Sequence, residues 1–154
     1  MDSLETTEAL PAPTQDERTF ALLTHILAMF SGFLVPLIFF LVKRESRFVS
    51  FHALQVLIWH VIYMVVFFFG MIVVFLTMIP TMMSQTGGTH SQAPPPGFFY
   101  VFGFVWLFGM GGWIVNLILG IVYAIKANNG EWARYPILGD WALDWVLRNA
   151  PQNS

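Results

Sequence analysis

The sequence contains no cysteine, which excludes disulfides, thiolate metal sites and a cysteine nucleophile. Charge is also scarce, because Lys, Arg, Asp and Glu make up only 10% of the 154 residues, against about 25% in an average soluble domain. The net charge of −2 provides no basic surface for a nucleic-acid partner. Hydrophobic residues supply 56% of the chain, more than a soluble domain of this length can bury. The composition therefore predicts an integral membrane protein.

The few charges leave two long charge-free runs, residues 19–42 and 48–125. A helix needs about 20 apolar residues to cross the hydrocarbon core of a bilayer. The second run is divided by a stretch rich in Pro, Gly, Ser and Thr at 80–97, which is expected to be an outer loop. The prediction is an all-α membrane domain over 14–136 with three transmembrane helices, at about 20–42, 51–79 and 98–125.

The two ends of the chain differ from this apolar domain. Residues 1–13 are acidic and contain two prolines, so a disordered tail is expected and a signal peptide is not. Thr14 and Glu17 have the spacing of a helix capping box, and Asn128-Asn129-Gly130 is typical of a helix C-cap. Residues 137–149 follow an amphipathic pattern, which predicts a helix lying on the membrane surface with Trp141 and Trp145 as interfacial anchors.

Lys and Arg mark the cytoplasmic side of a membrane protein. Three of them lie between the first two expected spans and three follow the third, whereas Arg18 alone precedes the first. With three spans, the pattern predicts a multi-pass protein of the bacterial cytoplasmic (inner) membrane, with the N-terminus outside and the C-terminus in the cytoplasm.

Small side chains recur every four residues in two of the expected spans, which lets membrane helices approach closely. The first and third helices are therefore expected to meet through Gly32 and either Gly112 or Gly120, with a kink at Pro36. The second helix is expected to present its large side chains to lipid or to a partner. The two stripes consist of Thr24, Ala28, Gly32 and Pro36, and of Gly112, Asn116, Gly120 and Ala124.

Polar side chains within the spans are expected to face the protein interior. The helical rise places His60 and Asn116 at similar depths, and we predict that they form a buried polar pair. The same arithmetic separates His25 from His60 by about 17 Å, and His52 from His60 by about 12 Å. Since these separations are too large for one shared iron or other metal, no cofactor and no metal are expected.

Catalytic motifs are missing from the sequence. There is no Gly-x-Ser-x-Gly, no His-Glu-x-x-His and no P-loop, so neither an enzyme nor a small-molecule substrate is indicated.

Two motifs, supported by Asp16-Glu17-Arg18 and Pro36-Leu37, carry a family resemblance. They are Phe51-His52-Ala53-x-Gln55 and Gly130-Glu131-x-x-x-Tyr135-Pro136. Together they make residues 16–136 resemble a bacterial family of small membrane proteins of unknown function, described as similar to the twenty-kilodalton Tic subunit of the chloroplast inner-envelope translocon.

Three functional readings remain open at this point. The first is a structural or accessory subunit that packs in the bilayer with itself or with a larger membrane complex. The alternative, which the resemblance implies, is a channel or translocon-like subunit. The third is a proton or haem-linked redox protein.

Overall fold

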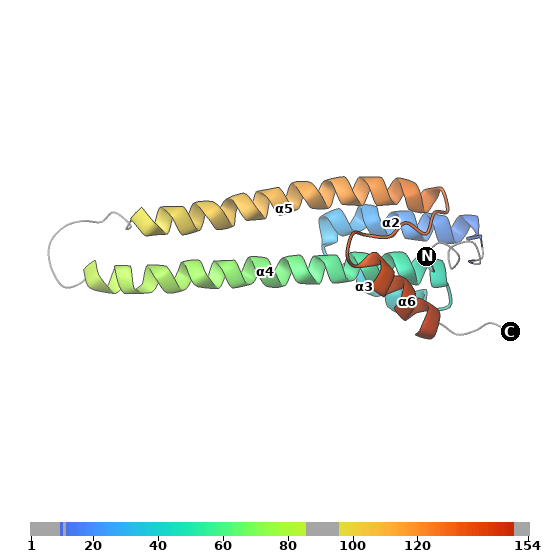
Figure 1. Ribbon diagram of the computed structural model, residues 1–154, viewed down its shortest axis with the longest axis horizontal. Coiled ribbons are helices and arrows are strands. Elements are labelled where there is room, and N and C mark those ends of the chain that lie inside the picture. Colours follow the sequence, from blue (N-terminus) through green and yellow to red (C-terminus); the bar gives the residue numbers. More distant parts are fainter. Residues whose placement is uncertain (1–9, 11, 86–95, 150–154) are drawn as a thin grey trace. The chain divides into compact units, whose positions relative to one another are not determined.

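The computed structural model describes residues 10, 12–85 and 96–149, and these residues form helices without any strand. Two of the helices are long and apolar enough to cross a membrane, over Arg47–Pro80 and Gly97–Asn128, where the sequence predicted three spans. In chain order the helices are α2 (Gln15–Ser31), α3 (Leu34–Val42), α4 (Arg47–Gln85), α5 (Pro96–Asn128) and α6 (Gly139–Asn149) (Figure 1).

The first helix, α2, begins at the expected capping box. The Thr14 hydroxyl accepts a hydrogen bond from the Glu17 backbone N–H, and the Glu17 carboxylate accepts one from the Thr14 N–H, which confirms the motif. The helix ends at Ser31 because Gly32 takes φ 61°, a conformation that glycine adopts without steric cost.

The single helix expected over 20–42 is therefore wrong, because the chain breaks at Gly32 into α2 and α3. Pro36 does not kink a continuous helix. It is the third residue of α3, where the missing N–H would have had no partner within the helix in any case.

α2 and α3 form a hairpin whose two ends lie together. The rings of Phe20 and Phe39 are 5.7 Å apart, and the Lys43 ammonium lies 4.1 Å from the centre of the Phe20 ring. Ser46, just before α4, donates its hydroxyl to Glu17 at 2.7 Å. Burial raises the pKa of the Glu17 carboxyl, but hydrogen bonds from Ser46 and Thr14 outweigh it and hold the pKa below its usual value.

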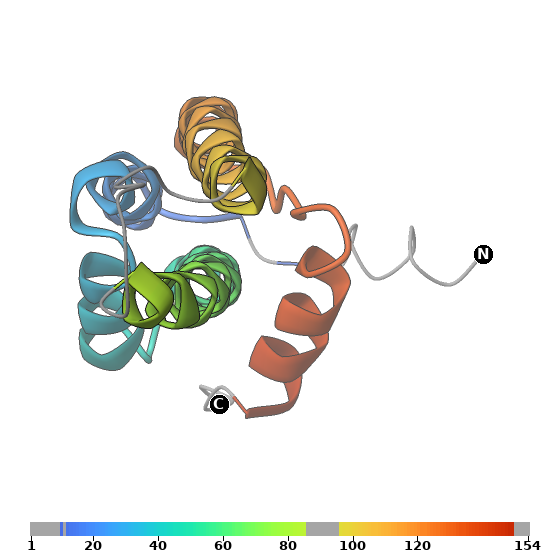
Figure 2. The same ribbon diagram turned by 90° about the vertical axis from the view of Figure 1, so that its left-hand side faces the viewer.

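The chain divides into two compact units, and the first comprises residues up to 61 together with those from 116 onward. Within it, α3 and α6 lie on different sides of α4 (Figure 2). Part of its core is an apolar cluster in which α6 packs against α4. The buried members of this cluster are Phe51, Leu54, Ala142, Leu143 and Val146.

Only part of the apolar face of α6 is therefore exposed. The helix was expected to lie with its apolar face on the membrane, but Ala142 and Val146 on that face are buried against α4. Trp141 and Trp145 remain 54% and 38% exposed. The difference arises because an amphipathic pattern defines an apolar face without specifying whether protein or lipid covers it.

Of the predicted packing glycines, Gly120 lies between α5 and α2. A Cβ added there would lie 2.9 Å from the Met29 side chain and 3.6 Å from the His25 carbonyl oxygen. Gly32 has no heavy atom within 4 Å of such a Cβ. It forms the hairpin turn and does not serve as a close-packing position between helices.

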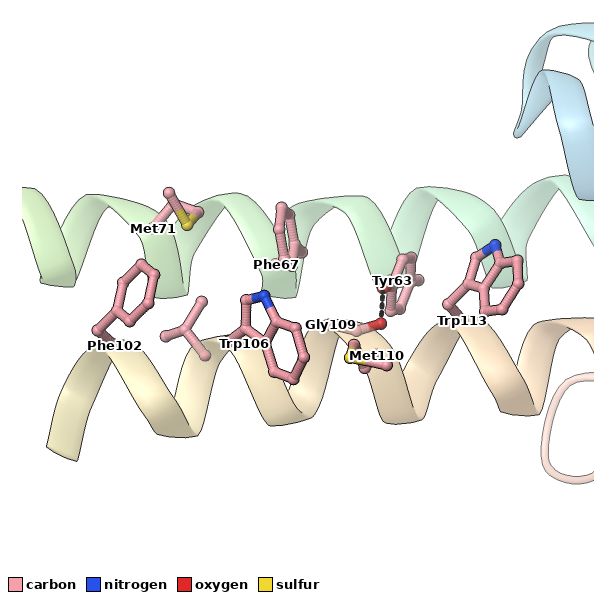
Figure 3. Close-up of a pocket in the computed structure, with 9 residues that line it drawn as sticks. Tyr63, Phe67, Met71, Phe102, Trp106, Gly109, Met110 and Trp113 are labelled. Carbon is pink, nitrogen blue, oxygen red and sulfur yellow. Dashed lines mark hydrogen bonds between the residues drawn. The ribbon is translucent and has the colours of Figure 1, made fainter. Parts of the chain in front are cut away.

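The second unit comprises residues 62–115, and its described residues belong to α4 and α5. Tyr63 donates its hydroxyl to the Gly109 carbonyl at 2.8 Å, and its ring occupies the space that a Cβ on Gly112 would need. Gly112 therefore accommodates Tyr63 of α4, not the first helix as predicted. A groove of about 320 Å³ runs beside this contact (Figure 3), lined by Tyr63, Phe67, Met71, Phe102, Val105, Trp106, Gly109, Met110 and Trp113.

α4 continues through Pro80 to Gln85, and α5 already begins at Pro96, so the loop predicted over 80–97 is too long. Membrane helices tolerate an internal proline better than soluble helices do. The rest of this loop and most of the tail predicted to be disordered lie outside the described residues.

Replacing Gly120 with Leu should force α2 away from α5 and lower the free energy of unfolding in detergent by about 1–3 kcal/mol. Gly111→Leu is the matched control, because a Cβ at Gly111 meets nothing within 4 Å, and it should be neutral or slightly stabilising. Equal losses of stability in the two variants would contradict the packing assignment.

Candidate functional site

A buried cluster of polar side chains lies within the first unit. His25 comes from α2, His52 and Gln55 from α4, and Tyr135 from the segment after α5. These four residues are between 0% and 4% exposed. Buried polar groups are costly unless they are hydrogen-bonded, so their partners show what the cluster does.

The cluster lies against residues 131–138, a non-helical segment that we call the strap. α5 stops before it as the sequence predicted. Gly130 takes φ 81°, and the Glu131 N–H donates to the Lys126 carbonyl at 3.0 Å, which confirms the C-cap. The strap has no regular secondary structure over 131–135 and leads into α6.

Gln55 hydrogen-bonds to the strap much as a neighbouring strand would. Its side-chain amide donates to the Ala133 carbonyl at 3.1 Å, and its carbonyl oxygen accepts the Tyr135 backbone N–H at 3.0 Å. A buried backbone outside a helix or sheet needs such partners for its N–H and C=O groups. One side chain of α4 therefore satisfies two backbone groups of the strap.

The two histidines extend this network, and its hydrogen bonds are donated from Tyr135 to His25, from His25 to His52, and from His52 to the Glu131 carbonyl. His52 Nε2 lies 3.2 Å from the Glu131 carbonyl, which can only accept, so this nitrogen carries the proton and Nδ1 is the acceptor. His25 Nε2–H then donates to His52 Nδ1 at 3.0 Å, and Tyr135 O–H donates to His25 Nδ1 at 3.2 Å. The hydrogen-bonding pattern fits neutral imidazoles at both positions.

Aromatic rings enclose this network. The Tyr123 and Tyr135 rings lie 4.3 Å apart, and Tyr123 donates its hydroxyl to the Arg134 carbonyl at 2.6 Å. Burial, with the neighbouring Tyr123 as the second cause, raises the pKa of the Tyr135 phenol. The Tyr135 hydroxyl therefore keeps its proton and remains a hydrogen-bond donor to His25.

The cluster is arranged to hold backbone in place. Both ring nitrogens of His25 and of His52 take part in hydrogen bonds within the protein. Across the described ranges, no group of three or more His, Cys, Asp or Glu side chains has the arrangement of a metal site. The chemistry that these contacts provide is the attachment of the strap to α2 and α4.

The structure brings both halves of the family motif together. Gln55 and His52 contact the strap at Ala133 and Glu131, while Phe51 packs on the Trp132 ring at 5.5 Å. Ala53 is fully buried. Pro136 follows Tyr135 and begins the turn over 136–138 at the end of the strap.

The start of α2 lies beside the start of α4, and His25 is in direct contact with His52. No motif in the sequence indicated this pair, nor the roles of Tyr123 and Tyr135. The three-residue spacing of His52 and Gln55 was the available signal, since it places both on one helix face.

The predicted pair of His60 and Asn116 does not form a direct hydrogen bond. His60 Nδ1 bonds to the Val56 carbonyl of its own helix at 2.9 Å, and its buried Nε2 has no hydrogen-bond partner among the residues that the structure describes. Asn116 is half-buried. The helical rise predicts depth alone, whereas the rotation of each helix decides which side chains meet.

Replacing Gln55 with Leu should leave the Ala133 carbonyl and the Tyr135 N–H unpaired. Each such buried group costs about 1–3 kcal/mol, so the free energy of unfolding in detergent should fall by several kcal/mol. The control is Gln15→Leu at an exposed position of α2, which should stay within about 0.5 kcal/mol of the wild type. A similarly small effect of Gln55→Leu would show that the strap does not depend on Gln55.

No curated protein and no solved structure matches the chain. A family model described as the magnetosome magnetite crystal formation protein family matches residues 16–142, a range that includes the whole buried cluster and the strap. The match supports the expected class, a bacterial family of small membrane proteins, and it does not support the likeness to the Tic subunit. The chain belongs to the magnetosome magnetite crystal formation family, MamF/MmsF.

Proposed function

We propose that this protein is a non-catalytic subunit of the magnetosome membrane that assists the formation of magnetite crystals. The observation that carries the proposal is the family match over residues 16–142 on a chain with two helices able to cross a membrane. The protein lies in the bilayer, and the proposed partners are other membrane subunits or further copies of the chain.

The buried cluster supports a structural role. Gln55 and the two histidines direct their polar atoms to the strap or to one another, so these groups are engaged in fixing the protein's own backbone. The strap in turn carries α6, which packs on α4. The polar residues of the family motif thus stabilise a rigid unit.

The proposed topology differs from the one that the sequence suggested. The Glu17–Ser46 hydrogen bond places the start of α2 beside the start of α4, so the N-terminal segment does not have to cross the membrane. All seven Lys and Arg residues lie outside the charge-free run 48–125. With two spans, all seven are on one side, and the positive-inside rule makes that side cytoplasmic. The connection between α4 and α5 then faces the compartment in which the crystal grows.

Single cysteines introduced into this cysteine-free chain test the topology in a bacterial host that inserts it into the cytoplasmic membrane. An impermeant thiol reagent should label Ser91→Cys in intact cells. It should label Ser3→Cys and Ser154→Cys only after the membrane is permeabilised. Labelling of Ser3→Cys in intact cells would instead support an N-terminus outside and three spans.

The functional proposal is tested in a magnetite-forming bacterium that lacks the gene for this chain. Crystals should differ in size or number from those of the parent by electron microscopy, and the wild-type gene or Gln15→Leu should restore them. Gln55→Leu should not restore them, because the unit held by the strap is destabilised. Unchanged crystals in the deletion strain would refute the proposal.

A further inference from the structure

The α2–α3 hairpin is too short for either of its helices to cross a bilayer. α2 has 17 residues and α3 has nine, which correspond to about 25 Å and 13 Å of helix. The hydrocarbon core is about 30 Å thick, and the first turn of α2 already contains Asp16 and Glu17. The apolar part of the hairpin therefore reaches into the bilayer without emerging on the other side.

The tip of the hairpin is suited to hydrocarbon. No charged residue occurs over 19–42, and Phe30 and Leu34 beside the turn are 86% and 53% exposed. Two of the polar groups at the turn bond back to α2, since Ser31 donates its hydroxyl to the Leu27 carbonyl and the Gly32 N–H donates to the Ala28 carbonyl. Such bonds lower the cost of placing polar groups in the hydrocarbon region.

Both ends of the hairpin return to one membrane face. Arg18 and Lys43 flank its charge-free part, and the Glu17–Ser46 hydrogen bond fixes the ends beside each other. This is the face that carries the Lys and Arg residues, which the proposed topology places in the cytoplasm. The hairpin therefore inserts from the cytoplasmic side and adds both of its helices to the cytoplasmic leaflet, although the end of α2 reaches past the bilayer midplane.

α6 and the residues that lead into it add exposed apolar side chains to the same unit. Ile137, which leads into α6, is 96% exposed and takes φ 73°, an uncommon conformation for a β-branched residue. Trp141 follows four residues later and is 54% exposed. An isoleucine held outward in this conformation beside an exposed tryptophan suits the interfacial zone of a bilayer.

We infer that this protein prefers, and promotes, membrane that is convex on its cytoplasmic face. A transmembrane helix adds similar area to both leaflets, whereas the hairpin adds the cross-section of two helices, each about 10–12 Å wide, to one leaflet. A leaflet enlarged in this way is accommodated best on the outside of a bend. The protein should therefore concentrate where the membrane bulges into the cytoplasm, as it does around a budding vesicle.

The inference is tested with the full chain reconstituted into fluorescent lipid vesicles of mixed diameter. An impermeant dye on Ser154→Cys reports only molecules whose cytoplasmic face points outward, so the measured quantity is dye per vesicle area. The density should be at least about twofold higher on vesicles of about 50 nm than on those of about 400 nm, a range over which curvature-sensitive insertion differs. Equal density at all diameters would overturn the inference.

Matched variants separate the hairpin from general hydrophobicity. The triple variant Phe30→Ala, Leu34→Ala and Ile38→Ala reduces the bulk of the hairpin and should abolish the dependence on diameter. The control Val65→Ala, Phe69→Ala and Ile72→Ala removes exposed side chains from α4 and should retain it. All six positions are exposed, and unchanged helix content by circular dichroism verifies folding. Retention of the dependence in the hairpin variant, or its loss in both variants, would overturn the assignment to the hairpin.

Discussion

Side chains of α4 hold the non-helical strap in place by satisfying its backbone hydrogen bonds. Gln55 supplies one acceptor and one donor to the strap, and His52 supplies another donor. The strap held in this way leads into α6, which packs on α4. Without these partners, the buried Tyr135 N–H and the partly buried Glu131 and Ala133 carbonyls would be left unpaired, a state that folded proteins avoid.

The hairpin depends on the same network from the other side. His25 attaches α2 to α4 through His52 and to the strap through Tyr135, while Gly120 lets α5 approach Met29. α2 is thereby fixed along one side. Phe30 on its other side remains exposed. The same helix therefore contributes to the polar cluster and carries an exposed apolar side chain.

Local signals in the sequence predicted local structure well. The capping box at Thr14 and the C-cap at Gly130 are both present, because each depends on neighbouring residues alone. The hairpin was not predictable in the same way. A charge-free run of this length satisfies the criterion for a span whether it is one straight helix or two folded ones, and only the backbone angle at Gly32 distinguishes them.

The contacts of the candidate site could not be predicted from the sequence, because they depend on how the helices pack. The contact of His25 with His52 was not expected because the first and second helices were predicted to start on opposite sides of the membrane. His60 and Asn116 form no direct hydrogen bond, since depth follows from the rise per residue but the direction of a side chain follows from helix rotation. The spacing of His52 and Gln55 indicated a shared helix face, yet most of their partners are backbone atoms of the strap, which the residue types do not reveal.

The separation in sequence between the two ends of the network has a consequence for biosynthesis. His25 and Tyr135 are 110 positions apart, and His52 and Glu131 are 79 apart. Both histidines are therefore synthesised and delivered to the membrane long before the strap exists. In that interval their nitrogens need water or lipid headgroups as partners, which holds the early segments near the interface. Contacts of such long range also form slowly, so the N-terminal hairpin reaches its final position only after the strap has left the ribosome.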